Sequence, residues 1–254
     1  MRTVRLKDVV LGEGPAKVLV PITPATIDEL VAQVDALANE DYDILEWRID
    51  FLQAAPDLAA CREAAAVLAE HTDRPVLATF RTADEGGEKA ISSQDYVALL
   101  GDLAASGNVA AVDVELFRGA EIARTIIDNA HAADVAVVAS FHNFDATPSA
   151  EEIVERLVAM DEAGADIPKL ACMPHDAGDL LTLLRGTWEA SQRIDRPLIT
   201  MSMGQTGVLS RAAGEIFGSA ATFGMVGRAS APGQVPVNEL RPVLAAIHRW
   251  SFGQ

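Results

Sequence analysis

The chain has 254 residues, half of them apolar, and a formal net charge of −17 at pH 7. This length suits one α/β barrel, which commonly uses about 250 residues, and the negative charge argues against binding to nucleic acid or to anionic membranes. Cys61 and Cys172 lack metal-site spacing, so we expect both to be reduced and structural. We find neither a secretion signal nor a membrane-spanning apolar run, and therefore expect a cytoplasmic protein.

The first segment predicts a short N-terminal β-hairpin that leads into a core strand. Val4 and Leu6 alternate with polar residues, a Gly-Glu-Gly-Pro turn lies at 12–15, and an apolar run follows at 18–22. Thr26, with Glu29 three residues later, has the pattern of a capping box, and apolar residues then recur at helical spacing. The first unit is therefore a strand followed by a helix.

This strand–helix unit occurs eight times along the chain. We predict strands at 17–22, 43–49, 75–81, 109–116, 134–141, 165–172, 197–203 and 219–226, and helices near 26–38, 56–71, 92–106, 119–133, 149–163, 176–192, 206–217 and 236–250. Buried strands that alternate with helices predict a parallel sheet, and eight such units favour a (β/α)8 barrel formed by a single domain, 1–254. The alternative is an open doubly wound sheet, but no Gly-x-Gly-x-x-Gly turn follows any strand.

A lysine lies in the predicted sixth strand, within an otherwise apolar run. Burial disfavours the charged form, so Lys169 is a candidate for a free amine, a nucleophile that forms a Schiff base with a carbonyl substrate. The alternative is a structural lysine whose stem is buried while its ammonium reaches water. Considered alone, Lys169 fits this second interpretation better, because most lysines stay solvated.

Other polar side chains near the strand ends favour the reactive interpretation of Lys169 over the structural one. The active site of such a barrel lies at the carboxyl ends of its strands. The period of two places Glu46, Arg48 and Asp50 on one side of the second strand. Arg81, which ends the third strand, offers a planar guanidinium for a carboxylate or a phosphate. For Glu46 and Arg48, a structural ion pair that closes a barrel layer is an equal alternative.

Two of the five histidines follow strands, and we rank His142 first as acid and base. His142 continues the fifth strand, next to the strand of Lys169, so it can approach a substrate held by that amine. His175 lies further into a loop. Glu85, in the loop after the third strand, is a candidate to orient the imidazole of His142 and to set its tautomer.

Two later segments are candidates to complete the site. Met201 and Met203 in the seventh strand can form adaptable apolar walls, although core packing is the default role of any one methionine. The loop 229–234 after the eighth strand is rich in small residues and is a candidate lid.

Motifs for these positions occur in order along the chain: Glu-Trp-Arg-Ile-Asp at 46–50, Thr-Phe-Arg at 79–81 with Glu-Gly-Gly-Glu at 85–88, Asp-Val-Glu-Leu-Phe at 113–117, Ser-Phe-His-Asn-Phe at 140–144, Ala-Asp-Ile-Pro-Lys at 165–169, Ile-Thr-Met-Ser-Met-Gly at 199–204, Phe-Gly-Ser-Ala-Ala-Thr-Phe-Gly at 217–224 and Ser-Ala-Pro-Gly-Gln at 230–234. Any one motif is weak. All of them in this order resemble the type I 3-dehydroquinate dehydratase family of the shikimate pathway, over nearly the whole chain.

The resemblance implies a (β/α)8-barrel lyase, usually a homodimer, that converts 3-dehydroquinate to 3-dehydroshikimate and water without a metal or other cofactor. Lys169 matches the Schiff-base lysine, and Glu85 matches the carboxylate paired with the catalytic histidine. His142 matches that histidine, which removes the C2 proton and protonates the departing hydroxyl. The positions that match substrate-binding residues are Glu46, Arg48, Arg81, Arg211, Ser230 and Gln234, with Arg211 the expected partner of the substrate carboxylate.

Three other functions stay open from the residues alone. An aldolase or transaldolase would use Lys169 to cleave a C–C bond, whereas a dehydratase would form an enone that absorbs in the ultraviolet. A metal enzyme would use Glu46, Asp113, Glu115 and His142 as ligands, although we expect Asp113 and Glu115 to pair with neighbouring arginines. A binding or regulatory barrel would keep the pocket without turnover.

Overall fold

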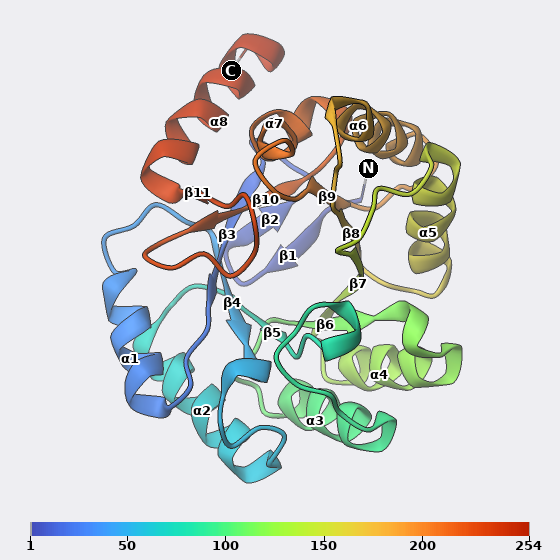
Figure 1. The fold of residues 1–254 in the computed structure, drawn as a ribbon. Coiled ribbons are helices and arrows are strands. Elements are labelled where there is room, and N and C mark those ends of the chain that lie inside the picture. Colours follow the sequence, from blue (N-terminus) through green and yellow to red (C-terminus); the bar gives the residue numbers. More distant parts are fainter. Residues whose placement is uncertain (1, 254) are drawn as a thin grey trace.

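The computed structural model describes residues 2–253 and has a ring of parallel strands surrounded by helices (Figure 1). The ring contains β3 (Lys17–Ile22), β4 (Ile44–Arg48), β5 (Val76–Thr79), β6 (Ala111–Glu115), β7 (Ala136–Asn143), β8 (Ile167–Cys172), β9 (Ile199–Ser202) and β10 (Ala221–Met225). The helices are α1 (Ile27–Ala36), α2 (Leu58–His71), α3 (Ser93–Ala105), α4 (Ala120–Ala132), α5 (Ala150–Glu162), α6 (Ala177–Ser191), α7 (Val208–Ala213) and α8 (Val237–Phe252). A two-residue strand, β11 (Val235–Pro236), pairs with β10.

The sheet closes between its last and first strands. Each strand from β3 to β8 pairs in parallel with the next strand of the ring, and β10 pairs with β3. Between β9 and β10 the closure is a single bridge, Leu198 with Ser219, and the Ala220 N–H donates to the Leu198 carbonyl at 2.8 Å. The predicted (β/α)8 barrel is therefore confirmed, and the open doubly wound alternative is wrong.

Three predicted elements end earlier in the structure than the sequence pattern suggests, and each has a local cause. β5 ends at Thr79, two residues before the predicted limit, and the Arg81 N–H donates to the Asp50 carboxylate at 3.3 Å. β4 ends at Arg48 because a 3-10 turn, η1 (Ile49–Phe51), follows it. In place of the predicted helix at 206–217, the structure has α7 followed by a 3-10 turn, η4 (Gly214–Phe217). The α-helix ends where Gly214 begins this turn, because glycine has a low helix propensity.

The N-terminal hairpin is present and covers the amino-terminal end of the barrel. β1 (Val4–Leu6) pairs antiparallel with β2 (Val9–Leu11). The turn lies at Lys7 and Asp8 rather than at 12–15, because Lys7 adopts a positive φ of 53° and its ammonium contacts the carbonyls of Asp73 and Arg74. The segment 12–15 instead connects the hairpin to β3. Three apolar side chains of the hairpin pack into the barrel interior.

The barrel interior is layered along the strands with a period of two. Near the amino ends, the interior is apolar and consists mainly of Leu19, Ile44, Leu77, Ala111, Val138, Ile167, Ile199 and Ala221. Two residues further along come Glu46, Thr79, Asp113, Ser140, Lys169, Met201 and Phe223. This second layer therefore contributes five buried polar side chains to the barrel interior, whereas the layer nearer the amino ends is apolar.

The predicted helix starts are also confirmed. Thr26 accepts a hydrogen bond from the Glu29 N–H at 3.2 Å, and Ser149 accepts one from the Glu152 N–H at the same distance. These caps satisfy N–H groups that a helix terminus leaves without partners. Among residues 2–253, no helix combines the length and apolar character that crossing a bilayer requires.

Two helical glycines test how closely the outer helices pack. A methyl group on Gly186 of α6 would lie 2.9 Å from the Ile153 side chain on α5, whereas on Gly101 of α3 its nearest neighbour is the end of the Asn129 side chain at 3.4 Å. We predict that Gly186→Ala lowers the free energy of unfolding by about 1–3 kcal/mol through overpacking. Gly101→Ala is the matched control and should raise it by up to about 1 kcal/mol through helix propensity. Urea titration measures both, and equal effects at the two sites would contradict the packing argument.

Candidate functional site

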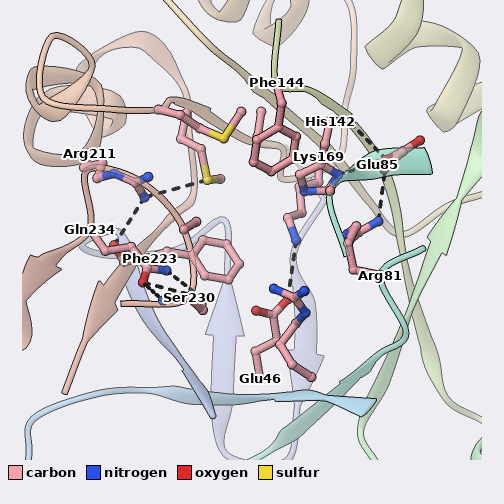
Figure 2. Close-up of a pocket in the computed structure, with 16 residues that line it drawn as sticks. Glu46, Arg81, Glu85, His142, Phe144, Lys169, Arg211, Phe223, Ser230 and Gln234 are labelled. Carbon is pink, nitrogen blue, oxygen red and sulfur yellow. Dashed lines mark hydrogen bonds and ion pairs between the residues drawn. The ribbon is translucent and has the colours of Figure 1, made fainter. Parts of the chain in front are cut away.

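A pocket of about 580 Å³, which includes its open mouth, lies at the carboxyl ends of the strands (Figure 2). All nine site residues suggested by the sequence line it: Glu46, Arg48, Arg81, Glu85, His142, Lys169, Arg211, Ser230 and Gln234. They come from β4, β7 and β8, from the segments that follow β5 and β10, and from α7. His175, the second-ranked histidine, is not among the lining residues, and its backbone N–H donates to Asp179.

Lys169 is buried at the base of this pocket, with 2% of its surface exposed. Its Nζ donates to Asp113 Oδ2 at 3.1 Å, lies 3.5 Å from Glu46 Oε1, and is 4.7 Å from the centre of the Phe223 ring. The alternative of an ammonium that reaches bulk water is therefore wrong. The sequence argument considered burial alone, whereas the structure adds two carboxylates that attract a positive charge on Nζ.

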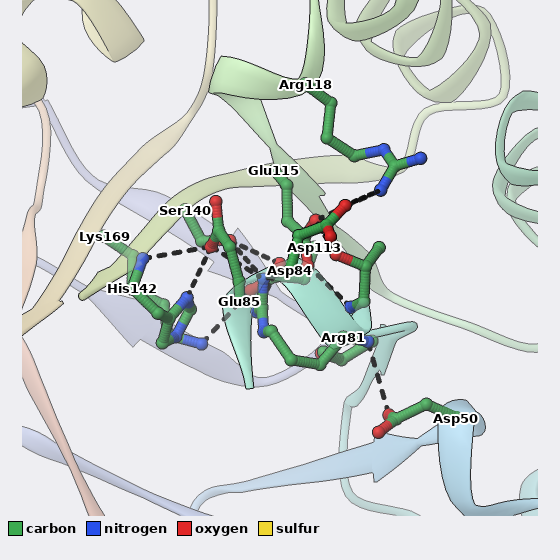
Figure 3. Close-up of polar contacts among 12 residues, drawn as sticks. Asp50, Arg81, Asp84, Glu85, Asp113, Glu115, Arg118, Ser140, His142 and Lys169 are labelled. Carbon is green, nitrogen blue, oxygen red and sulfur yellow. Dashed lines mark hydrogen bonds and ion pairs between the residues drawn. The ribbon is translucent and has the colours of Figure 1, made fainter. Parts of the chain in front are cut away.

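Arg81 connects the carboxylates of β6 into one buried network (Figure 3). Its guanidinium donates to Asp113 at 2.7 Å, to Glu115 at 3.0 Å and to Ser140 at 2.9 Å. Although burial raises the pKa of the Asp113 carboxyl, Arg81 and Lys169 together lower it below its ordinary value. Asp113 and Glu115 thus pair with an arginine as predicted, and much of the hydrogen-bonding capacity of Arg81 is already used within the protein.

The metal alternative finds no support in this geometry. Within the described part of the chain, no group of three or more His, Cys, Asp or Glu side chains is arranged to hold a metal ion.

Glu46 and Arg48 have separate partners. Glu46 accepts from the Thr79 hydroxyl at 3.0 Å and faces Lys169. Arg48 makes a two-point contact with Asp50, from Nε at 2.9 Å and from Nη2 at 2.7 Å. Within the described residues 2–253, no salt bridge joins Glu46 to Arg48. The structural ion pair that the sequence offered as an alternative therefore does not form.

His142 and Glu85 form a hydrogen-bonded pair at the pocket wall. Glu85 Oε2 lies 2.9 Å from His142 Nδ1 and also accepts from the His142 backbone N–H at 3.0 Å. Burial, assisted by the charges of Arg81, Lys169 and Arg48, lowers the pKa of His142 well below its ordinary value. The imidazole is therefore neutral at neutral pH. With the Nδ1 hydrogen directed at Glu85, Nε2 is left as the basic nitrogen.

The carboxyl of Glu85 is also reluctant to ionise. Burial raises the pKa of Glu85 to about 8, although the charge of Arg81 acts in the opposite direction. Burial therefore disfavours net charge on either member of the pair.

Arg211 is a buried cation with neutral neighbours. It is 1% exposed, and its guanidinium contacts the carbonyls of Phe223 at 3.4 Å and Pro232 at 3.1 Å and the Met201 sulfur at 3.9 Å. Burial lowers the pKa of Arg211 to about 10, and no salt bridge joins it to a carboxylate within residues 2–253. Its Nε has no hydrogen-bond partner among the described groups. Such a cation is prepared to receive an anionic ligand.

The loop 229–234 lies beside Arg211 and forms the opposite wall of the pocket (Figure 2). The Ser230 N–H donates to the side-chain oxygen of Gln234 at 2.8 Å, and the Gln234 amide donates back to the Ser230 hydroxyl at 3.1 Å. The Gly204 N–H donates to the Pro232 carbonyl at 3.1 Å. A side chain at Gly233 would come within 2.2 Å of the Gly204 carbonyl, so this approach requires glycine. The proposed lid motion stays a prediction.

Sequence reasoning missed two aromatic walls and one polar contact. Phe144 and Phe223 line the pocket, but neither was distinguished from core residues in the sequence. The contact between Asp113 and Lys169 was also missed. The period of two on β6 and β8 was the available signal, because it places both side chains in the same interior layer. Met201 and Met203 do line the pocket, as their positions suggested.

Comparison with known proteins identifies close relatives over the whole chain. A family model described as type I 3-dehydroquinase matches residues 18–251. The 3-dehydroquinate dehydratase of Salmonella agona strain SL483 is 49% identical over 251 residues, which are 98% of this chain and 100% of that protein. A type I 3-dehydroquinate dehydratase structure from Clostridium difficile has a TM-score of 0.94 at 42% identity and covers 98% of both chains. The Geobacillus kaustophilus 3-dehydroquinate dehydratase structure has a TM-score of 0.95 at 31% identity and covers 100% of this chain and 98% of that chain.

The raised pKa of Glu85 predicts a pH-dependent contribution to stability. Its value of about 8 exceeds the ordinary 4.5, so the folded state binds this proton more tightly than the unfolded state does. The resulting stability is fully present below pH 4.5 and is lost as the pH rises to 8. Glu85→Gln cannot ionise at this position and so avoids this loss of stability. The difference in melting temperature, variant minus parent, should therefore increase as the pH rises from 4.5 to 8. Thermal melts at a series of pH values measure the difference.

Glu88→Gln is the matched control, because it removes an exposed carboxylate from the same loop. The pH-dependent difference described for Glu85→Gln should not appear in this variant. Parallel pH profiles for the parent and Glu85→Gln would contradict the assignment of the shift to Glu85.

Proposed function

The chain belongs to the type I 3-dehydroquinase family, and from this premise we propose that Lys169 forms a Schiff base with 3-dehydroquinate during its dehydration. The observation that carries the proposal is that the buried Nζ of Lys169 shares one pocket with the neutral imidazole of His142. β7 and β8 are paired neighbours in the barrel, with Ser140 opposite Lys169. A ketone carbon bound to Nζ therefore lies within reach of a base on the adjacent strand.

The first step joins Nζ to the ketone carbon and releases the ketone oxygen as water. The amine attacks only after the ammonium has lost a proton, which Glu46, 3.5 Å from Nζ, can receive. Glu46 then returns this proton to the carbinolamine hydroxyl, which leaves as water. The product is a protonated iminium. Glu46 and Asp113 then face a cationic nitrogen, and this electrostatic contact stabilises the iminium relative to a neutral adduct.

The next steps move one proton through His142. The iminium withdraws electrons, so His142 Nε2 can remove the C2 proton and leave an enamine. The enamine electrons then expel the hydroxyl group, to which His142 returns a proton so that water departs. A second water molecule hydrolyses the remaining iminium, which releases 3-dehydroshikimate and regenerates the Lys169 amine. Glu85 keeps the imidazole oriented by its contact with Nδ1.

Arg211 is proposed to hold the substrate carboxylate at the other side of the pocket. Its buried guanidinium contacts only neutral groups of the described chain, so a carboxylate would supply the missing counter-charge. Ser230 and Gln234 would donate hydrogen bonds to substrate hydroxyls from the adjoining loop. Glu46, Arg48 and Arg81 would contact the substrate from the strands opposite. Together these contacts hold the reacting atoms over Lys169.

Borohydride trapping tests the covalent step directly. In the presence of 3-dehydroquinate, reduction should leave a stable mass adduct on Lys169, one of only four lysines in the chain. Lys169→Ala should abolish the adduct and the turnover. His142→Ala should still form the adduct but should turn over at least about 100-fold more slowly, because general acid–base catalysis is lost.

Lys17→Ala is the matched control for this experiment, since Lys17 begins β3 at the opposite end of the barrel. It should trap and turn over like the parent. An adduct mapped to Lys7, Lys17 or Lys89, or rapid turnover by Lys169→Ala, would refute the Schiff-base proposal.

The proposed enzyme acts in the cytoplasm as a homodimer. Two free, buried cysteines are compatible with a reducing compartment. Seven of the nine large apolar side chains exposed on the described chain lie on α6, α7, η4 and α8: Leu181, Trp188, Leu209, Ile216, Val243, Trp250 and Phe252. These elements are neighbours, since His248 of α8 contacts Glu215 of η4 at 2.7 Å. We call these seven residues the α6–α8 face and propose that a second copy covers it.

Charge on the α6–α8 face should separate the subunits. Trp188 is 52% exposed, so Trp188→Glu should leave the monomer folded while it places an unpaired carboxylate in the interface. Leu58→Glu is the control, because Leu58 is also exposed but lies on α2. Sedimentation velocity should show a dimer for the parent and Leu58→Glu and a monomer for Trp188→Glu. A dimeric Trp188→Glu variant would rule out this face.

A further inference from the structure

Asp50 is a buried carboxylate to which the pocket chemistry assigns no step. It lies in η1, directly after β4, and has no exposed surface. Each of its two oxygens accepts one hydrogen bond from the Arg48 side chain and one from a backbone N–H. Oδ1 accepts from Arg48 Nε and from Arg81 N–H, and Oδ2 accepts from Arg48 Nη2 and from Glu88 N–H. Four donors of known position therefore converge on one planar group.

The contacts to Arg48 orient a side chain that lines the pocket. A two-point contact between a carboxylate and a guanidinium allows one relative orientation of the two planes, unlike a single hydrogen bond. It occupies Nε and Nη2 of Arg48, and the centre of the Phe51 ring lies 5.1 Å from the guanidinium carbon. Nη1 is the remaining nitrogen, so Asp50 determines which part of Arg48 faces the ligand.

The two backbone contacts hold the loop that carries Glu85. We call residues 82–88 the Glu85 loop. The Arg81 N–H lies directly before this loop and the Glu88 N–H at its end, so both of its ends are bonded to the same carboxylate. Figure 3 shows Asp50 beside Arg81 in this arrangement. Within the loop, Glu85 contacts His142 through both Nδ1 and the backbone N–H.

The loop has little freedom to adjust if these contacts are lost. A side chain at Gly87 would come within 1.9 Å of the Arg81 carbonyl, and one at Gly86 within 2.3 Å of the Phe144 ring. The Gly87 N–H also donates to the Thr82 carbonyl at 2.8 Å. The loop is thus folded tightly onto its own base, and a shift at either end is transmitted to Glu85.

We propose that Asp50 is a positioning residue that sets the distance and orientation between Arg48 and the Glu85–His142 pair. This inference rests on the proposed function, in which Arg48 contacts the substrate and His142 transfers the proton. Asp50 touches neither the substrate nor the reacting atoms and acts through two other parts of the site. Its loss should therefore affect both KM, through Arg48, and kcat, through the Glu85 loop.

Asp50→Asn tests the proposal, because the amide nitrogen would face two donors whichever way the side chain is turned. The fraction of Lys169 trapped by borohydride counts the competent sites, and kcat is expressed per trapped site. We expect the trapped adduct to persist, KM to rise and kcat to fall, with a combined loss of about 10- to 100-fold in kcat/KM. Asp50→Glu keeps the charge but displaces the carboxylate, so kcat and KM should change in the same directions but by less. If Asp50→Asn does not fold, the kcat and KM of Asp50→Glu test the proposal instead.

Two further variants separate the roles. In an Arg48→Met background, Asp50→Asn should add little to KM but should still lower kcat, because only the loop contacts remain to be lost. Asp166→Asn is the structural control: Asp166 also accepts a backbone N–H, from Val137 at 2.9 Å, and pairs with Arg196 at 3.0 Å, but it lies at the amino end of β8, away from the pocket. It should lower the melting temperature and leave kcat and KM per trapped site unchanged.

The experiment distinguishes failure of the positioning role of Asp50 from failure of the proposed Schiff-base function. Absence of a trapped adduct in the parent would refute the Schiff base itself, whatever Asp50 does. The positioning role would be overturned by a different result, in which the parent traps normally. In that case Asp50→Asn would keep the parental kcat and KM per trapped site and would show only a lower melting temperature. Parental kcat and KM in Asp50→Glu would overturn the positioning role as well.

Discussion

The ion contact between Lys169 and Asp113, 3.1 Å apart inside a closed barrel, is the interaction on which the site depends. An isolated ammonium at this depth would be costly, and so would an isolated carboxylate. Each is acceptable because the other is present and because Arg81 and Ser140 satisfy the second oxygen of Asp113. The network thus places the proposed nucleophile away from bulk water without leaving its charge uncompensated.

The layering of the barrel makes this arrangement possible. The interior side chains come from parallel strands whose register is set by backbone hydrogen bonds, so their mutual distances are nearly fixed. The apolar layer below, closed by the N-terminal hairpin, prevents water from entering at the amino end. The polar layer can therefore be reached from the mouth of the pocket at the carboxyl ends of the strands.

Much of this architecture could be predicted from the sequence, because periodicity and caps are local. The eight strand–helix units, the capping residues Thr26 and Ser149 and the polar residues at strand ends all depend on neighbours within a few positions. Element limits were less accurate where a distant group intervenes, as when Asp50 takes the Arg81 N–H and β5 ends. The hairpin turn was misplaced because glycine and proline at 12–15 give a stronger local signal than the positive φ of Lys7.

The residues that line the pocket were easier to predict than the chemistry of the pocket, because this chemistry depends on which charged side chains have partners of opposite charge. From the sequence, Lys169, Arg81 and Arg211 are three cations near strand ends. In the structure Lys169 has two carboxylates near it, Arg81 has Asp113 and Glu115, and Arg211 has only carbonyls and a sulfur. These contacts hold Lys169, the amine proposed to react with the ketone, in place and anchor Arg81 to the carboxylates of β6. Arg211 has no carboxylate partner among the described residues, and the proposed substrate, with its carboxylate there and its ketone near Nζ, would satisfy both ends of the pocket at once.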